Sequence, residues 1–215
     1  MIKNDFITNP EAIEEELLIP VPDTDKGLPS PGLFNYYSQL KDRVIWIDAD
    51  VDEGVLDISR IIMMFNKEDQ GVPVEERKPI KLLLYTYGGD ALACFSLMDT
   101  IGASKTPVYT YNMGAAMSAG FLILLAGHKR YCLKHSTALL HSGSGKTSGT
   151  YEQSQAQNDD HKHFIKNMQN YVLERTKIDK KTLTKHEKSE WYIYAEDQLK
   201  YGIVDGIVEN IEELI

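Results

Sequence analysis

The sequence predicts an α/β domain that is built around a parallel β-sheet. Three observations support this fold class. A strand, a turn and a helix follow one another three times, over residues 43–65, 80–101 and 107–125. Residues 80–86 are almost continuously apolar, as expected of a strand that is covered on both faces. Chains of this pattern form parallel sheets with right-handed crossovers, and their functional loops gather at the carboxyl ends of the strands.

The composition limits the possible functions. The chain has 215 residues, 42% of them hydrophobic, and a formal net charge of −9. Without a basic run we expect no nucleic-acid partner. The longest apolar run, 121–126, is far shorter than the roughly 18 residues of a membrane span, so we expect no membrane attachment. Cys94 and Cys132 do not have metal-ligand spacing. We therefore expect a soluble cytoplasmic protein without a metal site.

The prolines divide the chain into two parts. Residues 1–32 are acidic and are interrupted by five prolines, which predicts an extended N-terminal arm with at most a short helix over 11–18. Residues 33–215 are expected to form a single folded domain. Its predicted strands are 43–47, 80–86, 107–111, 130–133, 137–141 and 203–208, with a short β-prone segment at 191–193; its predicted helices are 55–65, 92–101, 121–126, 151–176, 182–189 and 195–201.

The predicted helix over 151–176 has an uneven distribution of apolar residues. Its second half is amphipathic, whereas residues 152–163 are almost wholly polar. Such a segment either projects from the domain to contact another subunit or presents a solvated face. The sequence leaves both interpretations open.

Ser118 lies where a strand is expected to lead into a helix. Small residues surround it, and residues 116–120 read Ala-Met-Ser-Ala-Gly, one residue different from the Gly-x-Ser-x-Gly turn of serine hydrolases. The first N–H groups of a helix favour developing negative charge. Ser118 is therefore a candidate nucleophile, although small residues also occur where a buried helix packs closely.

Two other segments could supply the partners that a nucleophilic serine needs. Gly88 and Gly89 follow the strand at 80–86, and their backbone could stabilise an oxyanion or merely form a tight turn. His141 ends an apolar strand, where it could act as a general base or be a buried structural histidine. The segment 143–147 fails the phosphate-loop pattern, because Leu140 occupies the position of its first glycine. We expect a flexible loop there and no nucleotide.

Several segments resemble one known family. Residues 113–120 read Met-Gly-Ala-Ala-Met-Ser-Ala-Gly. They resemble the nucleophile segment of the ClpP family, Met-Gly-x-Ala-Ala-Ser-Met-Gly. ClpP proteins are the proteolytic subunits of the ATP-dependent Clp protease and belong to the S14 serine peptidases. The resemblance extends over residues 33–210. It is carried also by the segments 37–45, 87–89, 132–141 and 195–205.

The resemblance implies a fold and a set of site residues. The fold would be the ClpP/crotonase-like α/β fold of repeated β-β-α units, with the helix from residue 151 as a protruding handle. Ser118 matches the nucleophile, His141 the general base, and the N–H groups of Gly89 and Ala119 the oxyanion hole. Glu190 falls where the family has its third catalytic residue, an aspartate, and Glu187 is the nearest other carboxylate. No cofactor or metal is implied.

The resemblance also implies a function. The expected protein is a serine endopeptidase that cleaves peptides or unfolded proteins inside stacked heptameric rings of a homo-oligomer, fed by a separate AAA+ ATPase. Departures from the family occur at Glu190, at Tyr87 in place of proline, and at Met117 and Ala119 beside the serine. These departures leave an alternative, a non-catalytic ring subunit that works beside an active paralogue. Crotonase-type acyl-CoA chemistry shares the fold but leaves Ser118 and His141 unexplained as a pair.

Overall fold

The structure is a computed structural model that describes residues 31–143, 147–186 and 189–214. The chain divides into two units, residues 1–39 and residues 40–215. The predicted arm, residues 1–32, lies outside the described residues except for Pro31 and Gly32. Helix α2 (Pro31–Lys41) was not predicted. Proline suits its first position, because the first N–H groups of a helix have no intrahelical acceptor.

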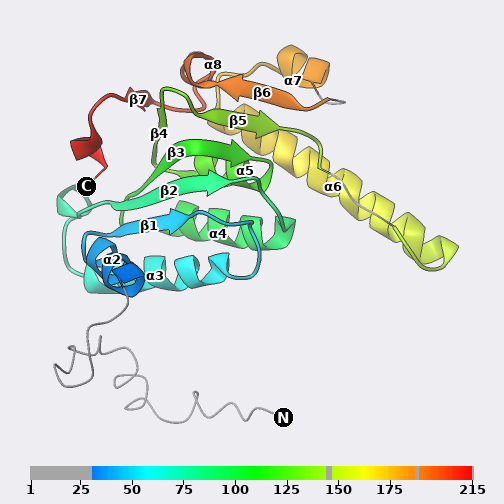
Figure 1. The fold of residues 1–215 in the computed structure, drawn as a ribbon. Coiled ribbons are helices and arrows are strands. Elements are labelled where there is room, and N and C mark those ends of the chain that lie inside the picture. Colours follow the sequence, from blue (N-terminus) through cyan, green and yellow to red (C-terminus); the bar gives the residue numbers. More distant parts are fainter. Residues whose placement is uncertain (1–30, 144–146, 187–188, 215) are drawn as a thin grey trace, which may run out of the picture. The chain divides into compact units, whose positions relative to one another are not determined.

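The second unit contains a mainly parallel sheet (Figure 1). Five parallel strands lie in the order β1 (Val44–Ile47), β2 (Ile80–Thr86), β3 (Val108–Met117), β4 (Lys129–Leu133) and β7 (Gly206–Val208). Strand β5 (Thr137–Leu140) pairs in parallel with β3, and β6 (Trp191–Tyr194) pairs antiparallel with β5. The α/β class and the parallel sheet that the sequence predicts are confirmed.

The helices of this unit follow the strands as the sequence pattern indicates. Three crossover helices are α3 (Val55–Glu68), α4 (Ala91–Ala103) and α5 (Ala119–Ala126), and every residue of α5 is buried. The later elements are α6 (Tyr151–Arg175), α7 (Lys180–His186) and α8 (Ala195–Lys200), with short 3₁₀ turns η2 (Val74–Glu76) and η3 (Ile211–Glu213). No helix in the described part of the chain is long and apolar enough to cross a bilayer.

Helix α6 is the long helix that the sequence predicts. It begins with a capping box in which Thr150 and Gln153 exchange side-chain and backbone hydrogen bonds. Its buried residues, Met168 and Val172, both lie in the second half. The polar first half runs outward beyond the sheet (Figure 1).

Strand β3 changes neighbours half-way along its length, which the sequence did not indicate. Residues 109–112 pair with β4, whereas residues 115–117 pair with β5. The change occurs at Gly114, where the backbone passes so close to the Tyr85 ring that a Cβ atom would lie 3.0 Å from it. This irregularity directs the end of β3, and therefore Ser118, toward β5.

Candidate active site

Ser118 occupies a strained turn between β3 and α5. Its backbone angles are φ 54° and ψ −117°, a conformation that is rare for any residue other than glycine. Its N–H donates to the carbonyl oxygen of Leu139 in β5 at 2.9 Å. The prediction that Ser118 lies at a helix N-terminus is confirmed, since it is the N-cap residue of α5. The sharp turn resembles the strained elbow that exposes a nucleophile in serine hydrolases.

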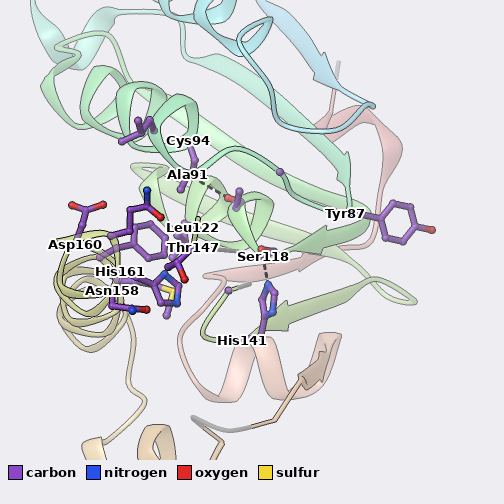
Figure 2. Close-up of a pocket in the computed structure, with 17 residues that line it drawn as sticks. Tyr87, Ala91, Cys94, Ser118, Leu122, His141, Thr147, Asn158, Asp160 and His161 are labelled. Carbon is purple, nitrogen blue, oxygen red and sulfur yellow. Dashed lines mark hydrogen bonds between the residues drawn. The ribbon is translucent and has the colours of Figure 1, made fainter. Parts of the chain in front are cut away.

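His141 follows directly after β5 and meets Ser118. The parallel ladder pairs Met117 with Leu139, so the strands β3 and β5 end side by side. The Nε2 atom of His141 lies 2.7 Å from the Ser118 Oγ atom (Figure 2). In the tautomer that carries its proton on Nδ1, Nε2 accepts from the serine hydroxyl, which is the geometry that general-base catalysis requires.

Gly88 packs against the backbone of this turn. Its φ is +102°, and a Cβ atom at this position would lie 2.7 Å from both the Met117 carbonyl oxygen and the Ser118 Cβ atom. A side chain at residue 88 would therefore push on the Ser118 turn. The double glycine is required here by close approach as well as by its backbone angles.

The N–H groups of Gly89 and Ala119 are the predicted oxyanion donors. Val51 donates its N–H to the Gly88 carbonyl at 2.8 Å and accepts from the Asp90 N–H at 2.6 Å. In this parallel bridge the N–H of the central residue, Gly89, points away from Val51. Ala119 is the first residue of α5, and first-turn N–H groups have no intrahelical acceptor.

A pocket of about 600 Å³ opens beside Ser118 and His141. Gly89 and Ala119 line it as well, so the four residues share one cavity. The labelled residues of α6 lie on one side of the serine, and Tyr87 points to the opposite side (Figure 2). The remaining lining residues include the apolar Leu122, Phe164 and Met168 and the polar Thr147, Gln157, Asn158, Asp160 and His161.

The sequence did not indicate that α6 forms part of this pocket wall. His161, Phe164 and Met168 recur at spacings of three and four, so they occupy one side of the helix. That spacing was visible, but it could not indicate that this side faces Ser118. The wall gives the cavity an apolar surface and a polar rim that could receive a side chain of a peptide.

Glu190 lies next to β6, and its hydrogen-bond partner is Tyr192. The β5–β6 ladder pairs Leu140 with Trp191, so Glu190 is one position beyond the last pair on its strand. Its Oε2 atom accepts a hydrogen bond from the Tyr192 hydroxyl at 2.7 Å. Within the described residues no hydrogen bond joins Glu190 to His141. Glu187, the other candidate carboxylate, lies outside the described residues.

Cys94 also lines the pocket, with its Sγ atom 3.3 Å from the Ala119 carbonyl oxygen. Burial, together with a smaller effect of the nearby Asp90 charge, raises the pKa of its thiol to about 12. Because the thiolate is the nucleophilic form, Cys94 is not a competing nucleophile at neutral pH.

The comparisons with known proteins agree on one family. The sequence model of the Clp protease family matches residues 31–211. The chain is 28% identical over 200 residues to the ATP-dependent Clp protease proteolytic subunit 1 of Chlamydia felis, covering 91% of this chain and 95% of that protein. It is 25% identical over 185 residues to the ATP-dependent Clp protease proteolytic subunit of Deinococcus radiodurans, covering 84% and 87% of the two chains.

Proposed function

This chain belongs to the Clp protease family, and on that premise we propose that it is a serine endopeptidase in which Ser118 is the nucleophile. The single observation that carries the proposal is the 2.7 Å hydrogen bond between Ser118 Oγ and His141 Nε2 in a common pocket. Peptide bonds in an unfolded or short polypeptide are the proposed substrate.

The geometry supports a double-displacement mechanism. His141 Nε2 takes the hydroxyl proton as Ser118 Oγ attacks the carbonyl carbon, and the carbonyl oxygen becomes an oxyanion that the N–H groups of Gly89 and Ala119 stabilise. His141 then gives the proton to the leaving amine, and the C–N bond breaks. Water, deprotonated by the same imidazole, hydrolyses the acyl-enzyme and regenerates Ser118.

Glu190 is proposed to orient the His141 imidazole during turnover. A carboxylate that accepts from Nδ1–H fixes the tautomer and stabilises the imidazolium form. We expect Glu190→Gln to lower kcat more than Glu187→Gln does. Equal effects of the two substitutions would contradict the assignment of Glu190.

The proposed assembly is a cytoplasmic homo-oligomer of stacked rings that receives substrate from a separate AAA+ ATPase. The support is the family itself, the outward-running polar half of α6, and relatives whose names describe ATP-dependent proteases. Residues 1–32 are proposed to be an arm distinct from the peptidase domain. Native mass spectrometry gives the subunit number, and a single-chain mass under native conditions would contradict the ring.

Hydrolysis of a small fluorogenic peptide tests the catalytic proposal. The wild-type assembly should cleave it, and Ser118→Ala should reduce cleavage to the uncatalysed rate. The matched control is Ser96→Ala, because Ser96 lies in α4 and does not line the pocket. Equal cleavage by wild type and Ser118→Ala would contradict the proposal.

A second function, a non-catalytic ring subunit, is favoured by one observation. Glu190 is bonded to Tyr192 and leaves His141 without a carboxylate partner in the described chain. Under this alternative the protein alone shows no cleavage, and the peptidase activity of a mixed assembly is unaffected by Ser118→Ala. Loss of activity in that mixed assembly on Ser118→Ala would exclude it.

A further inference from the structure

The Tyr192 hydroxyl is hydrogen-bonded to Glu190, the carboxylate that the proposed mechanism assigns to His141. The Tyr192 Oη atom donates to Glu190 Oε2 at 2.7 Å, and both side chains are exposed at the edge of β6. The hydrogen bond joins two residues that are only two positions apart in the sequence. Nothing in the rest of the fold therefore has to move for it to break.

The strand register places both residues on the same side as His141. Tyr192 is paired with Leu139 in the antiparallel ladder. The ladder ends with the pair Leu140–Trp191. Continued by one position on each strand, it would set Glu190 opposite His141, and residues two apart on an extended segment point to the same face. Side chains directly opposite one another begin about 5 Å apart at Cβ. In that register Glu190 would be within side-chain reach of His141 on one side, and it is bonded to Tyr192 on the other.

We infer that Tyr192 is a positioning residue that holds the Glu190 carboxylate away from His141, so that the triad is complete only when this hydrogen bond opens. The inference rests on the proposed function, in which Glu190 supports His141. In the structure the Oε2 atom of Glu190 accepts from Tyr192, and no hydrogen bond joins Glu190 to His141 within the described residues.

Two further features suit this role. The hydrogen bond to Glu190, with some desolvation and the charge of Glu190, raises the pKa of the Tyr192 hydroxyl, so it remains a neutral donor at physiological pH. The contact is exposed to water, where hydrogen bonds are weak. Both arrangements of Glu190 are then populated, and the hydroxyl changes their ratio without locking either one.

Tyr192→Phe is the direct test because it removes only the hydroxyl. We expect kcat for a small peptide to rise about two- to tenfold, with KM unchanged, since only the fraction of complete triads increases. The midpoint of the acidic limb of the kcat/KM profile should move to higher pH, because an adjacent carboxylate favours a protonated imidazole. Tyr194→Phe is the matched control: Tyr194 is on the same face of β6, and its hydroxyl makes no hydrogen bond in the described chain.

A double-mutant cycle separates this inference from the proposed function. In the Glu190→Gln background, Tyr192→Phe should have no effect on kcat. A fall in kcat or no change on Tyr192→Phe alone would overturn the inference, as would an equal rise in the Glu190→Gln background. If Glu190→Gln itself leaves kcat unchanged while Ser118→Ala abolishes cleavage, the inference is wrong and the peptidase assignment stands. If Ser118→Ala leaves cleavage intact, the proposed function itself is wrong.

Discussion

Ser118 and His141, 23 positions apart in the sequence, are joined by a 2.7 Å contact between Oγ and Nε2. They meet because β3 and β5 are parallel neighbours that end at the same edge of the sheet. The contact therefore depends on the short ladder between β3 and β5 and on the turn that supports the serine.

Gly88→Ala should disturb the nucleophile without removing it. The added Cβ would lie 2.7 Å from the Ser118 Cβ atom, at a residue whose φ is +102°. We expect kcat to fall about ten- to a hundredfold, because small displacements of reacting groups have large effects. The free energy of unfolding should fall by about 1–3 kcal/mol.

Gly102→Ala is the control for this substitution. Gly102 lies in α4, and a Cβ atom there would meet no atom within 4 Å apart from its own neighbours in the helix. The kcat of Gly102→Ala should equal that of wild type. Its free energy of unfolding should be unchanged or higher by up to about 1 kcal/mol. Urea denaturation and peptide hydrolysis measure both effects, and a Gly88→Ala enzyme with wild-type kcat would contradict the account of the turn.

Asp69→Asn should reduce the pH dependence of stability. The Asp69 carboxylate accepts two 2.7 Å hydrogen bonds from the Arg43 guanidinium and one from Thr106. The Arg43 hydrogen bonds hold the Asp69 pKa below its usual value of about 3.9. At a pH between its two pKa values, Asp69 binds more protons in the unfolded chain than in the folded one. The stability that the ionised Asp69 contributes is therefore complete above the unfolded pKa, and it is lost as the pH falls through the folded pKa.

The measurement is urea denaturation at a series of pH values. We expect Asp69→Asn to lower the free energy of unfolding by about 1–3 kcal/mol at pH 7. The difference from wild type should narrow as the pH falls below about 4. A difference that stays constant down to pH 2 would show that the ion pair does not contribute through its charge.

Gln198→Leu should loosen the strands that carry the site. Gln198 is fully buried in α8, and its Nε2 atom donates to the carbonyl oxygens of Ser136 and Ile193 at 3.2 and 2.9 Å. Its Oε1 atom accepts from Asn112 in β3 at 3.3 Å. Losing this network should lower the free energy of unfolding by about 2–4 kcal/mol, because buried polar groups are left unpaired.

The same substitution should also lower kcat, since Gln198 connects β3, which leads to Ser118, to the strands next to His141. Glu196→Ala, an exposed change in the same helix, should alter stability by no more than about 0.5 kcal/mol. Wild-type turnover in a destabilised Gln198→Leu protein would mean that the network supports the fold but not the site.

Local patterns explain why part of the site could be predicted. Ser118 lies between a β-prone segment and an apolar helical run, and His141 ends an apolar strand, so the sequence alone indicates a strand end for each. In a parallel sheet such ends share an edge, which makes the two residues candidates for one site. That β5 lies directly beside the end of β3 is shown only by the structure. The fold class and the two candidate residues follow from the sequence pattern.

Other features depend on tertiary contacts and were not predictable. The change of partner strand at Gly114 depends on how closely β3 passes Tyr85. Helix α2 begins at Pro31, which the sequence placed in an extended arm. The hydrogen bond of Glu190 to Tyr192 is a choice between two nearby partners, which no sequence pattern encodes.

The most direct test of the central claim is labelling with a fluorophosphonate, followed by peptide mapping. The probe phosphonylates a serine only when the hydroxyl is activated by a base. We predict a single modified residue, Ser118, in the wild-type assembly, with labelling lost in Ser118→Ala and strongly reduced in His141→Ala. Absence of labelling in the intact wild-type assembly, or equal labelling of Ser118→Ala, would contradict the assignment of Ser118 as the nucleophile.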